Sequence, residues 1–228
     1  MQRIGILGGI SHESTAVYYQ QIHAAHFARQ HDYYYPEVIV YSLNFQKFTD
    51  YEDSGDMVGY VEYILQGLIA LQRAGADFAL MAANSPHAVF AQLVARIPLP
   101  MLSIVEVTAQ HAQRQGWRRL LLLGIRFTMQ AAFYADVCAH YGIDVITPAP
   151  AEQAVINAII FDELVVGNFR EESRQTLLDV IARYRVDGVI LGCTELPLLL
   201  RPTDTTTPLL NTLALHVEAA VEYALSHK

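Results

Sequence analysis

The sequence contains very little cysteine and lysine. Cys138 and Cys193 are its only cysteines, and they lie too far apart to form a CxxC metal or redox motif. We therefore expect two free thiols in a reducing compartment rather than a disulfide framework. Lys47, in a polar stretch, and Lys228 are the only lysines. A pyridoxal enzyme, which needs a lysine for its Schiff base, is therefore disfavoured.

Positive charge and long apolar runs are also scarce. The 228 residues include 15 Lys and Arg against 23 Asp and Glu, a formal net charge of -8. No basic stripe is present that could neutralise a phosphate backbone, so nucleic acid is not an expected partner. No apolar run reaches the ~18 residues of a membrane helix, and no charged leader precedes the first strand-like segment. We expect a cytoplasmic protein without a membrane partner. No His, Cys or Asp spacing predicts a metal site.

Short apolar runs alternate with segments of helical periodicity through most of the chain. Runs that are apolar on both faces are typical of buried parallel strands. Strands are expected at residues 3–7, 37–43, 78–81, 120–123, 144–146 and 188–191. Helices are expected at residues 13–29, 56–74, 86–95, 105–115, 129–141, 152–166, 171–184 and 213–226. This alternation predicts an α/β fold with parallel sheets.

Proline-rich segments divide the chain into two lobes. We expect residues 1–98 and 209–228 to form an N-terminal lobe, and residues 99–208 to form a C-terminal lobe. The segments ILGGISHEST and LLGIRFTMQ resemble each other, as do FALMAANSPH and GVILGCTELP. Two copies of one α/β unit would be pseudo-symmetric, and their strand ends are expected to meet at an active-site cleft between them.

Four expected strands are followed by small residues and then by a hydroxyl or amide side chain. Backbone N–H groups at such turns can bind an anion, most simply a substrate carboxylate. The alternative is that these side chains only cap helices. The candidate substrate-binding residues are Gly9, Ile10, Asn84, Ser85, Thr128 and Thr194.

Cys193 is the candidate catalytic residue. It directly follows the apolar run GVILG and is expected to begin a helix, whose dipole would lower the pKa of the thiol. A thiol in this position can act as a base or a nucleophile. Cys138 lies in the middle of the expected helix AAFYADVCAHY and is expected to pack in the core.

Five segments resemble the aspartate/glutamate racemase family in order and spacing: IGILGGISHEST, AANSPH, LLGIRFTMQAAFY, INAIIFDEL and VILGCTELPLLL. The resemblance covers essentially the whole chain. It implies a cofactor-independent amino-acid racemase, an isomerase with two pseudo-symmetric α/β lobes, usually a homodimer. The family's GCTE motif falls on residues 192–195, which places one acid/base thiol at Cys193.

Two features depart from the family pattern. The resemblance implies a second acid/base cysteine in a turn usually written C-N-T, but here that turn is Ala83-Asn84-Ser85. His87 is a candidate replacement acid/base, or else it packs in its helix. Acidic-substrate racemases of the family also carry cations where this chain reads TDYEDSGD and PAEQAVINA. A neutral or apolar substrate side chain is therefore expected, because an unpaired buried charge is costly. The alternative is that Lys47 or Arg126 supplies the cation from a nearby loop.

Three functions are compatible with these residues. The first is racemisation of a small amino acid or carboxylate through proton transfer by Cys193. The second is a lyase or decarboxylase that uses one cysteine, as the related arylmalonate decarboxylases do. The third is a binding protein for a carboxylate or amino acid without catalysis.

The three tyrosines in HDYYYPEV are expected at a dimer contact, since tyrosine is enriched at interfaces.

Overall fold

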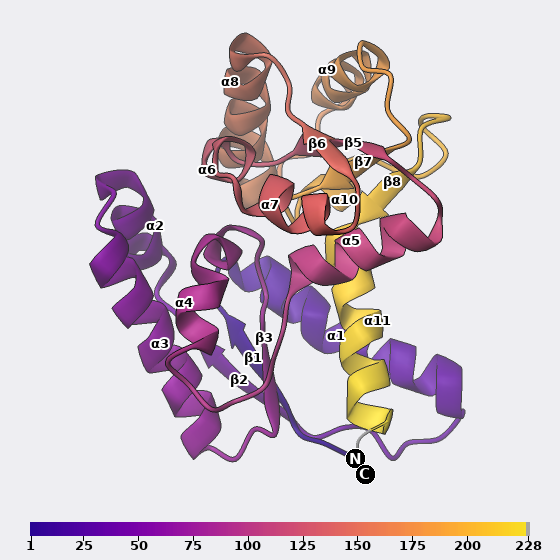
Figure 1. Ribbon diagram of the computed structural model, residues 1–228. Coiled ribbons are helices and arrows are strands. Elements are labelled where there is room, and N and C mark those ends of the chain that lie inside the picture. Colours follow the sequence, from indigo (N-terminus) through magenta and orange to yellow (C-terminus); the bar gives the residue numbers. More distant parts are fainter. Residues whose placement is uncertain (227–228) are drawn as a thin grey trace. The chain divides into compact units, whose positions relative to one another are not determined.

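A computed structural model describes residues 1–226, and the contacts divide the chain into two units (Figure 1). Unit 1 comprises Met1–Ile104 and the chain from His216 onward, and unit 2 comprises Val105–Leu215. The sequence places these boundaries a few residues earlier, at 98 and 208. Each unit contains one parallel sheet covered by helices, so the α/β fold is confirmed.

The sheet of unit 1 has the strand order β2-β1-β3-β4, and all its neighbouring strands are parallel. The elements in chain order are β1 (Ile4–Gly8), α1 (His12–Gln30), β2 (Val38–Ser42), α2 (Phe45–Ser54), α3 (Met57–Arg73), β3 (Phe78–Met81), the 3₁₀ helix η1 (Ser85–Val89), α4 (Phe90–Val94), β4 (Met101–Leu102) and α5 (Ile104–Arg114), which continues into unit 2. Helices α3 and α4 lie on one side of this sheet, and α1 and the final helix lie on the other (Figure 1).

The sheet of unit 2 has the equivalent order β6-β5-β7-β8, again all parallel. Its elements are β5 (Arg119–Leu123), α6 (Arg126–Gln130), α7 (Phe133–His140), β6 (Asp144–Ile146), α8 (Pro150–Ala158), the π-helix η2 (Ile159–Glu163), the 3₁₀ helix η3 (Leu164–Val166), α9 (Glu171–Ala182), β7 (Gly188–Leu191), α10 (Leu196–Leu199), β8 (Leu209–Asn211) and α11 (Thr212–Ser226), which continues into unit 1. The shared strand order supports the internal repeat inferred from the sequence.

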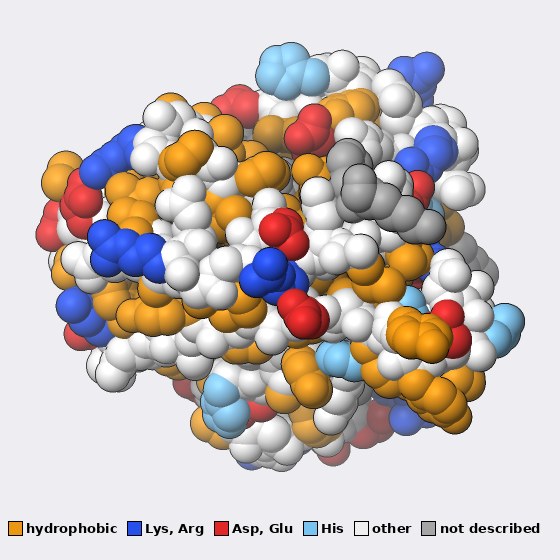
Figure 2. Space-filling view, turned by 90° about the horizontal axis from the view of Figure 1, so that it is seen from below, with side chains coloured by type: hydrophobic (Ala, Val, Ile, Leu, Met, Phe, Trp, Pro, Cys, Tyr) orange, Lys and Arg blue, Asp and Glu red, His pale blue; other side chains and the backbone are white. Residues whose placement is uncertain are grey.

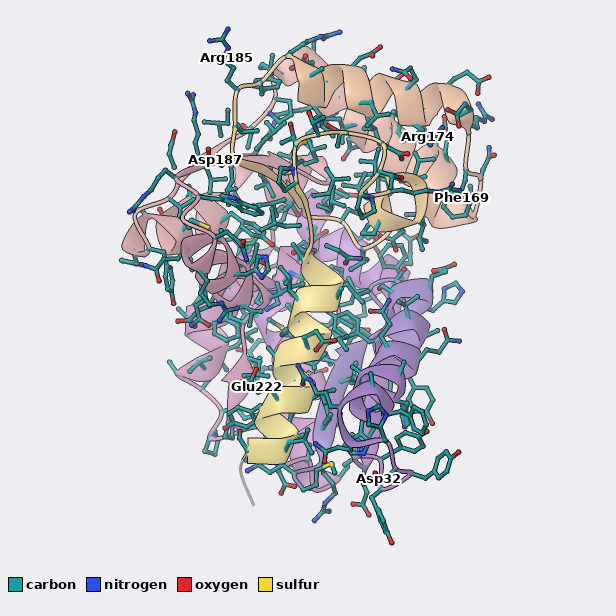
Figure 3. All side chains as sticks on the ribbon, turned by 90° about the vertical axis from the view of Figure 1, so that its right-hand side faces the viewer. Asp32, Phe169, Arg174, Arg185, Asp187 and Glu222 are labelled. Carbon is teal, nitrogen blue, oxygen red and sulfur yellow. The ribbon has the colours of Figure 1, made fainter. Side chains whose placement is uncertain are left out.

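Buried apolar strands build a separate core in each unit. All five residues of β1 are buried, as are all four of β3 and all four of β7. Helix α3 packs so closely against the sheet that position 67 has room only for a glycine. A Cβ at this position would lie 2.4 Å from Leu7 Cδ1. Asp187 directly precedes β7 (Figure 3). Its carboxylate accepts the N–H groups of Arg118 and Arg119 at 2.7 and 2.9 Å. Parallel strands buried on both faces are the pattern that the apolar runs indicate.

The strands β4 and β8 and the helix α2 are not among the elements expected from the sequence. Both strands are two or three residues long and follow proline-containing segments, so no periodicity reveals them. The ten residues of α2 are mostly polar and bury only Phe48, which explains why they resemble a loop in the sequence. Three expected helices are divided in the structure: residues 86–95 into η1 and α4, residues 129–141 into α6 and α7, and residues 152–166 into α8, η2 and η3.

The surface shown in Figure 2 mixes all side-chain types, with Lys and Arg scattered among acidic and hydrophobic residues. None of the helices within residues 1–226 has both the length and the hydropathy needed to cross a membrane.

Candidate active site

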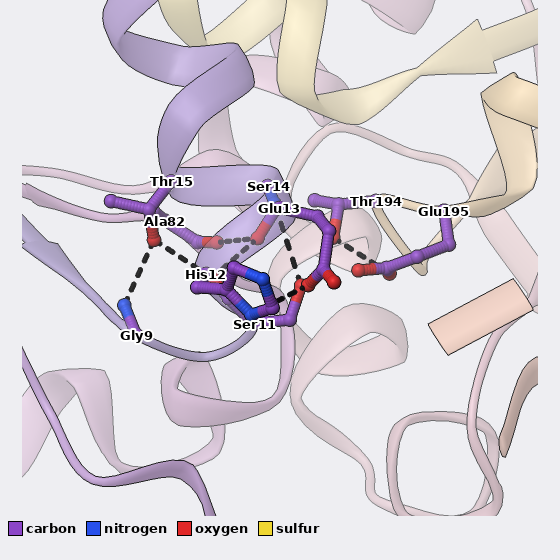
Figure 4. A network of polar contacts seen from close by, with 9 residues as sticks. All are labelled: Gly9, Ser11, His12, Glu13, Ser14, Thr15, Ala82, Thr194 and Glu195. Atoms are coloured by element: carbon purple, nitrogen blue, oxygen red, sulfur yellow. Dashed lines mark hydrogen bonds and ion pairs between the residues drawn. The ribbon is translucent and has the colours of Figure 1, made fainter. Parts of the chain in front are cut away.

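The turn after β1 is built mainly as the N-terminal cap of α1. Gly9 has a φ of +82° and donates its N–H to Thr15 Oγ1 at 2.8 Å. The same Thr15 hydroxyl donates to the Ser11 carbonyl at 2.8 Å, and Ser11 Oγ accepts the Ser14 N–H at 3.4 Å (Figure 4). The neighbouring Ile10 side chain is buried. Because the Gly9 N–H already has an acceptor, these contacts favour the capping role of this turn over substrate binding by Gly9 and Ile10.

The turn after β3 carries a buried polar cluster. Ala83, Asn84 and Ser85 are all buried. The Ser85 hydroxyl is hydrogen-bonded to the carboxyl group of Glu52, which lies near the end of α2, and to Tyr60 of α3. Tyr60 in turn donates its phenol hydrogen to Glu52 Oε1 at 2.8 Å. The turn therefore holds a carboxyl group that comes from another helix.

His87 follows this turn and is fully engaged within unit 1. Its Nδ1 lies 3.1 Å from the Ala83 carbonyl oxygen and must donate to it, while Nε2 accepts the Ile104 N–H at 3.2 Å. Burial, followed by the nearby His216 ring, lowers the pKa of His87 to about 3. His87 is thus neutral near pH 7, and neither ring nitrogen is available to a substrate. These contacts argue against His87 as the second acid/base group and favour its packing role.

His216, on α11, is also buried and also uses both of its ring nitrogens in hydrogen bonds within unit 1. Its Nδ1 accepts the Tyr18 hydroxyl hydrogen at 2.9 Å, and its Nε2 donates to the Leu102 carbonyl at 3.1 Å. Burial lowers its pKa to about 4. His87 and His216 therefore hold, in their neutral forms, the segment by which the chain leaves unit 1.

We expect these two rings to make unit 1 acid-sensitive. Above pH ~6.5 both are neutral in the folded and the unfolded chain. As the pH falls below ~6.5, the unfolded chain binds protons that the folded chain excludes until the pH approaches about 4 for His216 and about 3 for His87. Between pH 7 and pH 5 the free energy of unfolding should fall by about 2 kcal/mol for each ring.

Urea unfolding at pH 7 and pH 5 measures this decrease. The variant His216→Gln should be less stable at pH 7 and lose roughly half of the pH dependence assigned to the two rings. The variant His140→Gln, at an exposed position, should behave like the wild type. A His216→Gln variant with the full wild-type pH dependence would contradict the assignment.

In unit 2, Thr128 lies at the ends of β5 and β7. A Cβ on Gly124 would lie 3.3 Å from Thr128 Cβ, and a Cβ on Gly192 would lie 3.4 Å from Thr128 Cγ2. Thr128 is fully buried, yet its hydroxyl has no hydrogen-bond partner among residues 1–226. Buried hydroxyl groups nearly always have a partner, so this hydroxyl is a candidate ligand contact.

Cys193 lies one residue beyond Gly192, in the turn between β7 and α10. The side chain is partly exposed, and its Sγ donates to Glu195 Oε2 at 3.0 Å. The Thr194 hydroxyl donates to the same carboxylate oxygen at 2.9 Å (Figure 4). The thiol and a carboxylate are therefore in direct contact, which permits a proton to pass between them.

The electrostatics of Cys193 differ from the sequence prediction. Helix α10 begins only at Leu196 and has four residues, so Cys193 does not begin the expected helix. The backbone N–H groups of Thr194 and Glu195 lower the pKa of the thiol only in part. Burial raises the pKa of the Cys193 thiol well above its usual range, and the negative charge of Glu195 raises it further. The prediction of a lowered pKa is wrong, because the thiol is buried and the charged group beside it, Glu195, is an anion.

Glu52 and Glu195 were not identified as site residues from the sequence. Glu195 could have been found, since it stands two residues after Cys193 in the same turn. Glu52 carries no comparable sequence signal, because it lies in a polar segment remote from Ser85 in the chain.

The parallel sheets and the thiol at a strand end define an α/β protein with a candidate proton-transfer site. Residues 7–220 match the Asp/Glu/Hydantoin racemase family. The chain therefore belongs to this family.

Three relatives show how far the likeness extends. The broad specificity amino-acid racemase RacX of Bacillus subtilis is 26% identical over 99% of both chains. The crystal structure of an aspartate racemase homologue from Pyrococcus horikoshii is 35% identical, with a TM-score of 0.86 over 99% of this chain and 100% of that one. The aspartate racemase of Picrophilus torridus has a TM-score of 0.79 at 22% identity over 98% of this chain and 94% of that chain, a likeness of fold.

Proposed function

We propose that the protein is a cofactor-independent isomerase that racemises a small α-amino acid, with Cys193 as one acid/base group. The observation that carries the proposal is the hydrogen bond from Cys193 Sγ to Glu195 Oε2 at 3.0 Å, in the turn that follows β7. Family membership supports the same class of reaction.

The raised pKa of Cys193 determines how its proton is used. Near neutral pH the side chain is a thiol, so it can donate a proton to a carbanion at the α-carbon of the substrate. In the opposite direction the thiol must first lose its proton, and the adjacent Glu195 carboxylate can accept it. Glu195 therefore positions the thiol and holds its proton.

The substrate α-carboxylate is assigned to Thr128 and Thr194, which lie in unit 2. Asn84 and Ser85 of unit 1 remain candidate substrate-binding residues. Thr128 offers a hydroxyl without an internal partner. A neutral or apolar substrate side chain is proposed because Lys47, which directly precedes the segment FTDYEDSGD, places its Nζ 4.5 Å from the centroid of the Tyr63 ring. An ammonium group that already contacts an aromatic face is a poorer partner for the side-chain carboxylate of an acidic substrate.

Proton exchange at the α-carbon tests the function. The purified protein is incubated in D₂O with L- and D-alanine, serine, methionine, leucine, aspartate and glutamate, and deuterium incorporation and enantiomer composition are measured. Racemisation of neutral amino acids is expected. A preference for aspartate or glutamate would overturn the proposed side-chain selectivity, and exchange with none of them would argue against the racemase proposal.

A lyase or decarboxylase with one thiol is the second candidate, because Ala83 has no atom that can transfer a proton. Protonation of one face would give a single enantiomer and release a second product. A protein that is stabilised by carboxylates in thermal unfolding but turns nothing over would instead be a binding protein.

The variant Thr128→Val separates binding from stability. It replaces a buried hydroxyl without an internal partner by a methyl group, so the free energy of unfolding of the ligand-free protein should rise by about 1 kcal/mol. Stabilisation by a millimolar substrate should decrease at the same time. Thermal unfolding with and without substrate measures both effects.

The control is Thr176→Val, where the hydroxyl already donates to the Glu172 carbonyl at 2.8 Å. This variant should gain no stability and should bind like the wild type. Unchanged substrate stabilisation in Thr128→Val would remove Thr128 from the proposed site.

A homodimer is proposed as the assembly. Tyr33 and Tyr34 are 79% and 82% exposed, and Tyr33 lies 5.6 Å from the Phe27 ring, which is also exposed. Such a cluster suits burial against a second copy. Sedimentation of the wild type and of Tyr34→Glu tests this assembly.

A further inference from the structure

Helix α2 is only weakly embedded in unit 1, where it lies beside α3 (Figure 1). Its ten residues are mostly polar, and Phe48 is its one buried residue. The centroid of the Phe48 ring lies 5.0 Å from that of Tyr60 on α3, and the centroid of the Tyr51 ring lies 5.8 Å from that of Tyr63. A segment with few buried apolar contacts opens at a much lower free-energy cost than the domain that carries it. Opening α2 exposes little apolar surface.

The chain is anchored on both sides of α2. Before the helix, the Leu43 N–H donates to the carbonyl of the last residue of β1 at 2.9 Å. After it, the Asp56 side chain caps α3 by accepting the Gly59 N–H at 2.9 Å. Gly55 connects the two helices with a φ of +69°, and a Cβ there would meet no atom within 4 Å. Residues 44–55 therefore lie between two fixed points, with a glycine in open space at one of them.

Glu52 connects α2 to the turn that follows β3. Tyr60 donates to Glu52 Oε1 at 2.8 Å, and the Ser85 hydroxyl forms a second side-chain hydrogen bond with the same carboxyl group. Ser85 is only 6% exposed, and its hydroxyl is also hydrogen-bonded to Tyr60. A ligand can reach this hydroxyl only if the contact with Glu52 opens.

A carboxyl group holds α2 in place less firmly than an amide would. Burial raises the pKa of Glu52, although the hydrogen bonds from Ser85 and Tyr60 lower it in part. Glu52 forms no ion pair with a Lys, Arg or His within residues 1–226. A glutamine could make the same hydrogen bonds without the cost of burying an ionisable group. The contact is therefore suited to a connection that opens and closes.

We propose that α2 is a lid of unit 1 that opens about Gly55 while the rest of the unit stays folded, and that the hydrogen bond between Glu52 and Ser85 is its latch. Opening moves Glu52 away from the turn and frees the Ser85 hydroxyl. The lid involves residues of unit 1 alone and does not depend on the reaction. Its use, the admission of an amino acid to Ser85, rests on the proposed function.

The single lysine of α2 makes the opening measurable. Lys47 and Lys228 are the only lysines, and Lys228 is the last residue, so a protease that cleaves after lysine has one internal bond to cut. This bond lies inside α2, and the rate at which the native protein is cut follows the population of the open state. The rate should depend only weakly on urea, because local opening exposes little surface. Cleavage with the full urea dependence of global unfolding would overturn the lid.

Three variants test the latch. Glu52→Ala removes two hydrogen bonds, so the native protein should be cut roughly 10-fold faster than the wild type. Glu52→Gln can keep both hydrogen bonds and should be cut no faster than the wild type. The matched control is Asp50→Ala, which removes an exposed acid from the same helix and should change the rate by no more than about twofold.

Two results would overturn the latch. One is a Glu52→Ala variant that is cut at the wild-type rate, and the other is an equal acceleration in Asp50→Ala, which would mean a general weakening of the helix. If Glu52→Ala does not fold, Ser85→Ala removes the other partner of the latch and should also be cut faster. A wild type that is cut as expected but turns over no amino acid contradicts the proposed function and leaves the lid intact.

Discussion

Replacing Cys193 by alanine is expected to abolish racemisation and to remove α-proton exchange for one of the two enantiomers. Lost acid/base groups typically reduce rates by roughly 10²- to 10⁴-fold. The thiol should contribute on this scale, because its hydrogen bond to Glu195 gives its proton a carboxylate acceptor in the same turn.

The control for this prediction is Cys138→Ala. Cys138 is fully buried in α7, and burial raises the pKa of its thiol to about 12. The substitution should cost on the order of 1 kcal/mol of stability through lost packing. It should leave proton exchange unchanged for both enantiomers. Exchange that persists for both in Cys193→Ala would show that this thiol is not the acid/base group.

The fold could be predicted from the sequence because parallel strands buried on both faces leave a clear pattern. Runs such as residues 120–123 and 188–191 are apolar throughout and coincide with β5 and β7 to within one residue. The short strand β8 leaves no such pattern. It has three residues, and its position is fixed by pairing with β7 rather than by its own periodicity.

The candidate site was predictable only where its residues are neighbours in the chain. Cys193 follows β7 directly, and Thr128 follows β5 after a short turn, so strand ends identify both. The contact of Glu52 with Ser85 joins segments far apart in sequence, and it depends on α2, which has a polar composition. The raised pKa of Cys193 was missed because it depends on the orientation of one carboxylate, which the sequence pattern does not specify.

Introducing a thiol at position 83 should raise the racemisation rate above that of the wild type. Cys193 remains in place, and Ala83 stands where the family resemblance implies a second acid/base thiol. The variant Ala83→Cys should gain roughly 10²-fold or more in rate, because a positioned acid/base group contributes on that scale. Chiral chromatography of the amino acid that the wild type turns over best measures the gain.

The matched control is Ala83→Ser. Ala83 is 6% exposed and belongs to the core cluster of unit 1, so either larger side chain should cost about 1–3 kcal/mol through overpacking. Serine imposes a similar steric cost but is a far weaker acid than a thiol near neutral pH, so it should add little activity. A gain with cysteine alone would support a second acid/base thiol at this turn. A folded cysteine variant without a gain would place position 83 out of reach of the α-carbon, and the two-thiol mechanism implied by the family resemblance would then not extend to this turn.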